Sequence, residues 1–389
     1  MTTKTQFNKN PIKPLISSVA DKEVIWLPNI NKYIVVNSPI EKIVKQIYRG
    51  KSDKQVINYC INKLGFSPDE SSQILHVTKN NLKRLQTNKN VLNNENSFQL
   101  KIHSATFNNK RYYRINDLIF FIEYEIAEIE YLIHPKFAHL EIKNTGQFDN
   151  HFQLFKVDSE IALVVNGKFS GSWSLDKEHF MTGKVSMEIL QKIYKKEEEE
   201  WMAVFHAAGI SNGKKGILFL GDSGNGKSTL SALLMSSGFE VLADDFLPVE
   251  SDTSQLCFFP AAISVKKHAI DLLIPTFPEL KHAKEYLYPA FNKTVRYLSN
   301  SDSAKGKPKK VQCKALVFVK YDSKAELQFS SLPKDIAFQK LVPDSWISPF
   351  EKNAKLFLDW FGRLPCYQLT YSNNETMVET VKNIFEDEV

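Results

Sequence analysis

The sequence predicts a mixed α/β (α+β) protein with more than one domain, and three observations lead to this prediction. Two β-rich runs followed by three amphipathic helical patterns occupy residues 21–86. Short segments of alternating apolar and polar residues fill 98–200. A buried apolar run at 216–220 then leads through a glycine-rich loop into an apolar helix at 230–235. Together with the chain length of 389 residues, these patterns indicate two or three domains.

The composition is typical of a globular chain with buried cores: 43% of the residues are hydrophobic and 24% are charged. The formal net charge of +6 is mild and comes from scattered Lys and Arg residues. The four cysteines form no CxxC pair, which argues against a zinc site or a disulfide framework. There is no signal-peptide pattern and no apolar run of bilayer length, so we expect a cytoplasmic protein without a membrane partner.

The N-terminal part predicts a flexible tail at 1–20 and a first domain at 21–86. The runs VIWLP and YIVVN predict a β-hairpin. Ser38, Ser52 and Ser67 each precede an amphipathic helical pattern, and serine is a favoured N-cap residue. A hairpin and three helices make a small winged-helix-like domain, which is followed by a polar linker at 87–97. No Arg-rich recognition helix accompanies it, so nucleic acid is not the expected partner, although a DNA-binding winged helix is the competing interpretation.

Residues 98–200 predict the β-rich part of a second, larger region. Segments such as KRYYRI, LIFFIEYEIA and EIALVVNGKFSGSWSL alternate in polarity and predict antiparallel strands joined by turns. A helix is expected at 185–200, and its closing run of Lys and Glu predicts a solvated face without chemistry. Residues 201–389 then form the predicted ATP-binding catalytic domain.

The glycine-rich loop has the pattern G-x-x-x-x-G-K-S of a phosphate-binding P-loop, and it lies between a strand and a helix as such a loop requires. Glycines let backbone N–H groups wrap around phosphate oxygens, and the helix N-terminus favours negative charge. Lys227 would neutralise the β- and γ-phosphates, and the Ser228 hydroxyl would hold Mg²⁺. We therefore expect ATP and Mg²⁺ to bind. The loop comprises Gly221, Asp222, Ser223, Gly224, Asn225, Gly226, Lys227, Ser228 and Thr229.

Two carboxylates, Asp244 and Asp245, end the next predicted strand at 239–243. Beside a P-loop, such a pair can divide two tasks: one carboxylate holds Mg²⁺ and the other accepts a proton from a nucleophile. A turn or a helix cap is the alternative interpretation, since Asp is common in both. His206 precedes the P-loop strand in an apolar segment, where a lone histidine is more often a core residue than a functional one.

Residues 205–250, which include His206, the loop and the Ala-Asp-Asp strand end, closely resemble the core of the HPr kinase/phosphorylase family. Asp244 lies seventeen positions after Lys227, as in that family. The resemblance implies a fold like that of phosphoenolpyruvate carboxykinase. It also implies that Asp244 is the general base, that Asp245 and Ser228 hold Mg²⁺, and that His206 tunes the carboxylate.

The resemblance is looser after Asp245. FFPAAISVKKHAIDLL is similar to the family segment that carries a basic residue into the site, which makes Lys266 a candidate for phosphate or substrate contact, with Arg296 as a weaker one. Two departures matter. The family's glycine- and arginine-rich second signature is not recognisable, so we expect kinase activity without phosphorolysis. Thr229 stands where the family usually has Glu after the loop serine.

The N-terminal domain resembles PqqD-like domains, which recognise precursor peptides in ribosomal peptide (RiPP) pathways. Element order and apolar spacing carry this resemblance. Such domains bind a leader peptide as an added strand along the hairpin edge and the third helix. The resemblance therefore implies a groove formed by Tyr33, Ile34, Val35, Val36, Ile74, Val77 and Leu82.

The leading hypothesis is an ATP-dependent kinase that phosphorylates a Ser or Thr hydroxyl on a precursor peptide or protein bound by the N-terminal domain. A kinase of the same fold acting on a small-molecule hydroxyl is the first alternative. A non-catalytic, nucleotide-responsive scaffold in a peptide-maturation complex is the second. No feature specifies an oligomeric state, so a homo-oligomer stays open.

Overall fold

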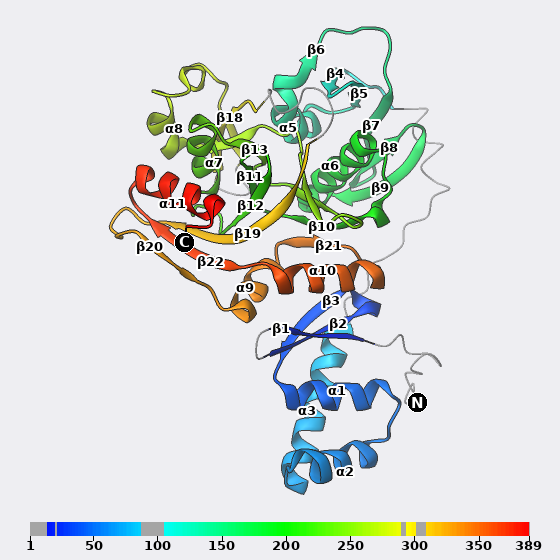
Figure 1. Ribbon diagram of the computed structural model, residues 1–389. Coiled ribbons are helices and arrows are strands. Elements are labelled where there is room, and N and C mark those ends of the chain that lie inside the picture. The colour runs from blue at the N-terminus through cyan, green and yellow to red at the C-terminus, as the bar shows by residue number, and fades with distance from the viewer. Residues whose placement is uncertain (1–13, 20–21, 87–104, 289–292, 301–308, 389) are drawn as a thin grey trace. The chain divides into compact units, whose positions relative to one another are not determined.

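A computed structural model describes most of the chain (Figure 1). The described residues are 14–19, 22–86, 105–288, 293–300 and 309–388. They form two compact units: unit 1 is Met1–Val91 with Leu332–Arg363, and unit 2 is Leu92–Ser331 with Leu364–Val389. The mixed α/β fold class is confirmed. Unlike the predicted domain limits, these units place Leu332–Arg363 with the N-terminal part of the chain.

Unit 1 is a three-stranded antiparallel sheet, ordered β1-β2-β3, together with helices from both ends of the chain. Its elements are β1 (Leu15–Val19), β2 (Lys22–Leu27), β3 (Lys32–Val36), α1 (Ser38–Tyr48), α2 (Asp53–Leu64), α3 (Pro68–Gln86), α9 (Lys334–Leu341), β21 (Ser345–Ile347) and α10 (Glu351–Arg363). Residues 1–13 of the predicted tail and the predicted linker at 87–97 lie outside the described residues. The rest of the tail differs from the expectation, because β1 pairs with β2 along its whole length.

The helices α1 and α3 cover one face of this sheet, and α2 packs against these two helices. Side chains alternate between the two faces of a strand, and Ile25 of β2 lies directly opposite Ile34 of β3. Both isoleucines pack against Val44 of α1 and Leu82 of α3. The hairpin expected from the sequence is thus two strands of a three-stranded sheet, and its apolar face holds the helices.

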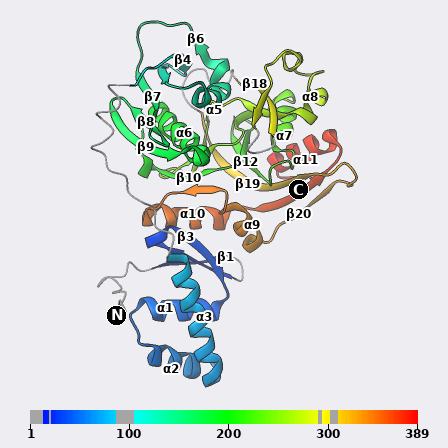
Figure 2. The same ribbon diagram turned by 180° about the vertical axis from the view of Figure 1, so that it is seen from behind.

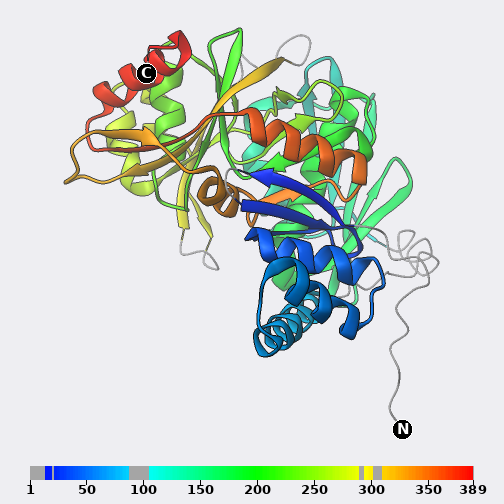
Figure 3. The ribbon, with the colours of Figure 1, turned by 60° about the horizontal axis from the view of Figure 1, so that its bottom comes forward.

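The other face of the sheet packs on residues that are distant in sequence. The ring of Tyr33 meets the rings of Phe338 and Phe357 edge-on, with centroid distances of 6.0 and 5.5 Å. The Asn31 side-chain amide donates a hydrogen bond of 2.7 Å to the carbonyl of Ile347. Figure 3 shows α10 beside this sheet, opposite the N-terminal helices. These contacts explain why Leu332–Arg363 belongs to unit 1.

Unit 2 is built around a mixed sheet with the order β13-β11-β12-β19-β15-β14-β10. β22 pairs in parallel with the second half of β19, and β20 pairs with β22. The strands are β10 (Trp201–Phe205), β11 (Ala208–Ser211), β12 (Lys215–Leu220), β13 (Glu240–Ala243), β14 (Leu247–Glu250), β15 (Gln255–Cys257), β19 (Lys310–Tyr321), β20 (Gln328–Ser331) and β22 (Cys366–Tyr371). The helices α7 (Lys227–Ser236) and α11 (Asn374–Glu386) lie beside it (Figure 2).

A second sheet of unit 2, ordered β6-β4-β5-β7-β8-β9, occupies the region predicted to be β-rich. It contains β4 (Asn109–Ile115), β5 (Leu118–Tyr124), β6 (Glu141–Ile142), β7 (Asn150–Val157), β8 (Glu160–Val165) and β9 (Lys168–Ser174), with the helices α5 (Ala127–Phe137) and α6 (Glu178–Tyr194). The helix predicted at 185–200 therefore begins earlier and ends earlier. It ends at Tyr194 because Lys195 adopts a left-handed backbone conformation with φ 53°.

A small third sheet, ordered β16-β18-β17, completes unit 2. It is formed by β16 (Ile263–Lys266), β17 (Tyr286–Tyr288) and β18 (Lys293–Leu298), and the helix α8 (Lys267–Leu273) follows β16 directly. Within the described residues, no helix has the length and apolar character needed to cross a membrane.

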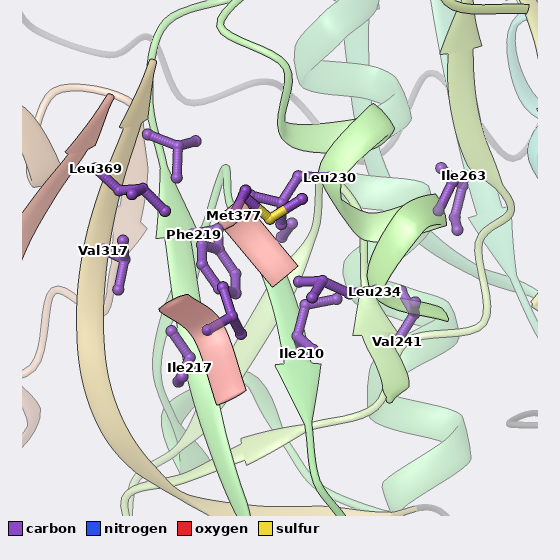
Figure 4. Close-up of a cluster of buried hydrophobic side chains, with 14 of the residues drawn as sticks. Ile210, Ile217, Phe219, Leu230, Leu234, Val241, Ile263, Val317, Leu369 and Met377 are labelled. Atoms are coloured by element: carbon purple, nitrogen blue, oxygen red, sulfur yellow. The ribbon is translucent and has the colours of Figure 1, made fainter. Parts of the chain in front are cut away.

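The core of unit 2 fixes the position of α7 over the central sheet. Leu230 and Leu234 of α7 are fully buried against Ile210 and Phe219 of the sheet (Figure 4). Met377 of α11 belongs to the same cluster. Burying side chains of this size contributes about 1.5–3 kcal/mol each relative to exposure. The start of α7, where the P-loop ends, is therefore held firmly against the sheet.

Glu250, at the end of β14, forms a buried charge cluster that we expect to stabilise unit 2. Its carboxylate lies 2.8 Å from the ammonium groups of both Lys196 and Lys310, and only 2% of the residue is exposed. Burial alone would raise the pKa of Glu250, but hydrogen bonds from Lys196, Lys310 and Thr253 outweigh it and lower the pKa to about 2. A carboxylate with a lowered pKa stabilises the fold above its ordinary pKa and loses that contribution as the pH falls.

Glu250→Gln is expected to lower the free energy of unfolding at neutral pH by about 2–3 kcal/mol, because Lys196 and Lys310 lose the buried carboxylate that they share. Differential scanning calorimetry as a function of pH measures the effect. The difference between wild type and variant should shrink as the pH falls from about 4.5 towards 2. Glu240→Gln is the matched control, since its more exposed pair with Lys309 is expected to contribute less than about 1 kcal/mol. Equal effects of the two variants would contradict the assignment.

Candidate active site

The direction of the strands brings the predicted site residues to one edge of the central sheet. β12, β19 and β22 run in parallel, and β11 runs antiparallel to both β12 and β13. β13 therefore runs in the same direction as β12. The loop after β12, the two aspartates after β13 and His206 just before β11 consequently meet at the same edge.

Two glycines of the loop are required by their surroundings. A Cβ atom on Gly221, which has φ 151°, would lie 2.6 Å from the carbonyl oxygen of Val319. Gly226 has φ 91°, a left-handed conformation that favours glycine, and a Cβ atom there would contact Tyr321 and Tyr371 at 3.1 and 3.3 Å. The ends of β19 and β22 thus press directly on the loop, and only glycine fits without displacing them.

Lys227 and Ser228 begin α7 and face the inside of the loop. The Lys227 ammonium donates a hydrogen bond to the carbonyl of Gly221, and Lys227 is only 6% exposed. The Ser228 hydroxyl donates to Asp244 Oδ2 over 2.9 Å. A positive charge and a helix N-terminus therefore point to the same small volume, which suits a phosphate group.

Asp244 is buried directly behind the loop, with 3% of the residue exposed. Its Oδ2 accepts hydrogen bonds from the Ser228 hydroxyl and, over 3.0 Å, from the backbone N–H of Ser264. Its Oδ1 is buried and has no hydrogen-bond partner within the part of the chain that the structure describes. Burial, followed by the charge of Asp245, raises the pKa of Asp244 to about 7, against the lowering effect of these hydrogen bonds. One oxygen of the Asp244 carboxylate is thus fixed by two hydrogen bonds, and the other has no hydrogen-bond partner among the described residues.

Asp245 is the more exposed carboxylate of the pair, with 40% of its side chain accessible. His206 Nε2 lies 3.8 Å from Asp245 Oδ1, an ion-pair distance rather than a hydrogen bond. Burial would raise the pKa of Asp245, but the positive charges of His206, Lys293 and Lys227 outweigh it and hold that pKa below its ordinary value. The two neighbouring carboxyls therefore have different environments, and Asp245 stays ionised.

A hollow opens above the loop and collects most of the predicted site residues. Lys266 reaches it from the end of β16 and donates a hydrogen bond of 3.1 Å to the Ser223 hydroxyl. Asn225 does not line the hollow; its carbonyl instead accepts a hydrogen bond from the Tyr321 N–H. The lining residues are His206, Asp222, Ser223, Gly224, Gly226, Lys227, Ser228, Thr229, Asp245, Lys266, His268 and Lys293.

Sequence reasoning missed Lys293 and His268, which line the same hollow. Lys293 begins β18, and its charge acts on Asp244, Asp245 and Lys266. Burial, and then the charges of Lys293 and Lys227, lower the pKa of Lys266. The sequence offered one signal for Lys293: it lies three residues before the predicted candidate Arg296, on the same strand.

The structure places Arg296 away from the hollow. Its guanidinium donates hydrogen bonds to the carbonyls of Leu280 and Lys281, over 2.7 and 3.1 Å, and lies 3.7 Å from Glu285. Lys293 and Arg296 are three residues apart on one strand, so their side chains leave opposite faces. Arg296 therefore holds the segment before β17, while Lys293 faces the loop.

The donor atoms at this edge suit a Mg²⁺ ion. Mg²⁺ prefers oxygen ligands and is usually bound by one or two carboxylates together with phosphate oxygens. Ser228 Oγ and the ionised Asp245 carboxylate supply such atoms. The described residues contain no group of three or more His, Cys, Asp and Glu side chains that could hold a metal ion alone. Phosphate oxygens would therefore complete the coordination.

The residues predicted for a leader groove lie in unit 1 and have three kinds of environment. Tyr33 faces the aromatic rings of α9 and α10. Several belong to or pack against the apolar clusters beneath the sheet, namely Ile34, Val36, Ile74 and Leu82. Val35 is half-buried on β3, and Val77 is 49% exposed on α3. Along β3, the described part of the chain adds no further strand on the side away from β2.

No family model and no curated protein matches this chain. Among solved structures, the chain is similar to the HPr(Ser) kinase/phosphatase from Coxiella burnetii, with 11% sequence identity and a TM-score of 0.23. The match covers 47% of this chain and 94% of that one. A likeness of this size leaves the function to be inferred from the side chains of the site.

Proposed function

We propose that this protein is an ATP-dependent kinase that transfers a phosphoryl group to a Ser or Thr hydroxyl. The observation that carries the proposal is the convergence, at one sheet edge, of a P-loop with three lysines and two carboxylates in different environments. The lysines Lys227, Lys266 and Lys293 suit the negative charge of a triphosphate. A carboxylate with one free oxygen suits a hydroxyl nucleophile, which must lose a proton.

In the proposed reaction, the acceptor hydroxyl oxygen forms a bond to the γ-phosphorus as the bond to the β,γ-bridging oxygen breaks. The hydroxyl proton passes to the free oxygen of Asp244, and ADP leaves. Lys227, Lys266 and Lys293 stabilise the charge that spreads over the phosphoryl oxygens. Mg²⁺, held by Ser228 and Asp245, would neutralise part of that charge. The charge of His206 lowers the pKa of Asp245. We therefore assign His206 a positioning role: it supports the ionised Asp245 carboxylate beside the site.

A transfer assay tests the proposal directly. The full-length protein is incubated with ATP, Mg²⁺ and Ser- or Thr-containing peptides, and phosphopeptide and ADP are measured together. We expect ADP and phosphopeptide to form in equal amounts. Phosphorylation of small polyols but not of peptides would favour the small-molecule alternative. Nucleotide binding without turnover for any acceptor would favour a scaffold and contradict the kinase proposal.

We further propose that unit 1 recruits the acceptor peptide along the outer edge of β3, between that strand and α3. This edge offers backbone groups for an added strand, and Val77 is an exposed apolar side chain on α3. Deleting the residues before 98 is a poor test, because it would also uncover Phe338 and Phe357, which pack on Tyr33. A point variant on the exposed surface avoids this problem.

Val77→Asp is expected to raise the KM for a peptide that carries its recruiting segment by about tenfold. The reason is that burying one apolar side chain of this size changes an affinity by about that factor. The kcat, and the KM for a peptide without that segment, should stay within about twofold. Steady-state kinetics on both peptides make the measurement. Ile336→Asp is the matched control, because Ile336 is 42% exposed on α9 of the same unit. Equal effects on both peptides would count against recruitment by this surface.

A further inference from the structure

A second hollow lies in unit 2, and its walls are mainly apolar. It is formed by α5, the start of α6 and the strand β17. Its lining residues are Glu128, Ile129, Tyr131, Leu132, Ile161, Leu175, Glu178, Leu287 and Tyr288. Leu175 is 49% and Leu287 is 56% exposed, and large apolar side chains gathered in this way indicate a binding surface. The phosphoryl-transfer chemistry proposed above does not use this hollow.

The walls of the apolar hollow are held in place before anything binds. The Tyr131 hydroxyl accepts a hydrogen bond of 2.7 Å from the Leu287 N–H and lies 3.2 Å from the Leu287 carbonyl. The Tyr131 ring also contacts the rings of Tyr286 and Tyr288, with centroids 5.4 and 5.6 Å apart. A preformed apolar surface binds an apolar group without the cost of ordering its own walls.

Two elements run from the apolar hollow to the phosphate site. On α5, Leu132 lines the hollow, and Lys136 lies one turn later, about 6 Å along the helix. The charge of Lys136 acts on Asp245. Tyr288 of β17 lines the apolar hollow and is paired with Lys293 of β18, which lines the hollow above the glycine-rich loop. The Cα atoms of such a pair lie about 5 Å apart. The two sites are therefore neighbours.

The charged residues that line the two hollows indicate that the hollows bind different kinds of group. Glu128 and Glu178 place carboxylates at the apolar hollow, which disfavours a nucleotide there. The carboxylates can accept hydrogen bonds from peptide N–H groups, whereas walls that are mainly apolar offer few polar partners to the many hydroxyls of a polyhydroxylated small molecule. The chemistry of this hollow thus fits an apolar side chain on a peptide.

We propose that the apolar hollow binds a large apolar side chain of the acceptor peptide, about two residues from the hydroxyl that is phosphorylated. The spacing follows from the two distances above, because an extended chain advances about 3.3 Å per residue. This inference rests on the proposed kinase function and specifies its substrate: a peptide in which a leucine-sized side chain lies about two residues along the chain from the Ser or Thr.

Short synthetic peptides test the proposal with the full-length protein. Each contains one serine, and a leucine is moved one position at a time away from it; a peptide with alanine in place of leucine is the reference. With wild type, leucine two residues from the serine should lower the KM about tenfold relative to alanine. Transfer with the same KM for every peptide would overturn this inference alone. Absence of transfer to any peptide would overturn the kinase function and this inference with it.

Leu287→Ser should reduce the preference for leucine to within about twofold, while the kcat and the KM for ATP stay within about twofold of wild type. Leu175→Ser removes a wall contributed by a different segment and should act in the same way, so the test does not depend on the folding of one variant. Leu327→Ser is the matched control, because Leu327 is 43% exposed in unit 2 and does not line the hollow. A preference that persists in both hollow variants would overturn the proposal.

Discussion

Replacing Asp244 with asparagine is expected to lower the rate of phosphoryl transfer by about a thousandfold, which is the usual worth of a positioned proton acceptor. The asparagine carbonyl can still accept the hydrogen bonds from Ser228 and Ser264, so the loop should keep its shape. The amide group has a far lower basicity than a carboxylate and cannot take the hydroxyl proton. Single-turnover kinetics with saturating ATP measure the chemical step, and titration calorimetry measures the Kd for ATP, which should change by less than about fivefold.

Asp245→Asn is the matched partner of this experiment. Asp245 lines the hollow and is held ionised by nearby cations, so its loss should weaken the binding of Mg²⁺ and lower the rate. We expect the Mg²⁺ concentration for half-maximal activity to rise about tenfold or more in this variant, and to stay nearly constant in Asp244→Asn. The reverse pattern would exchange the two roles. Full activity of Asp244→Asn would contradict the mechanism.

Lys227→Met is expected to lower kcat/KM for ATP by about a thousandfold, because the variant removes the buried positive charge nearest to the loop while keeping the length of the side chain. A methionine also fills the space left by the lysine stem, so the stability of unit 2 should change little. Steady-state kinetics over a range of ATP concentrations and a thermal melt give the two readouts.

Lys214→Met is the control for Lys227→Met, since Lys214 is exposed just before β12, at the opposite end of that strand from the loop. It should leave kcat/KM for ATP within about twofold of wild type. If Lys227→Met bound and turned over ATP as wild type does, the loop would not be the nucleotide site. A large fall in the melting temperature of Lys227→Met would instead show that the ammonium is needed for folding.

The elements of the catalytic region could be predicted because their patterns are local. A buried strand, glycines at required positions and a helix follow one another within about twenty residues, and the glycine at 221 is dictated by a carbonyl oxygen 2.6 Å from its missing Cβ. The placement of Asp244 and Asp245 beside the loop follows from strand direction alone. Lys293 could not be predicted with equal force, because β18 belongs to a different sheet and only its pairing with β16 brings that cation to the hollow.

The segments that form unit 1 were harder to predict from the sequence. Its three helices could be predicted, because each has its own amphipathic pattern after a serine. The partners of Tyr33 are Phe338 and Phe357, some three hundred residues later, and no local pattern links them. The strand β1 was missed for a similar reason: a run of five residues gains its stability from pairing with β2, and a short run alone is a weak signal.

The glycine-rich loop, the pair of aspartates and the mixed α/β class could be read from the sequence, because each depends on spacing within a single stretch of chain. Only the folded chain shows which cations reach the proposed phosphate site, which carboxylate is buried, and that an apolar hollow adjoins them. Those features depend on contacts between segments far apart in sequence. Such contacts produce no local or periodic pattern of residues from which they could be predicted. For this reason Lys227 and Asp244 could be named from the sequence, whereas Lys293 and Leu287 could be named only from the fold.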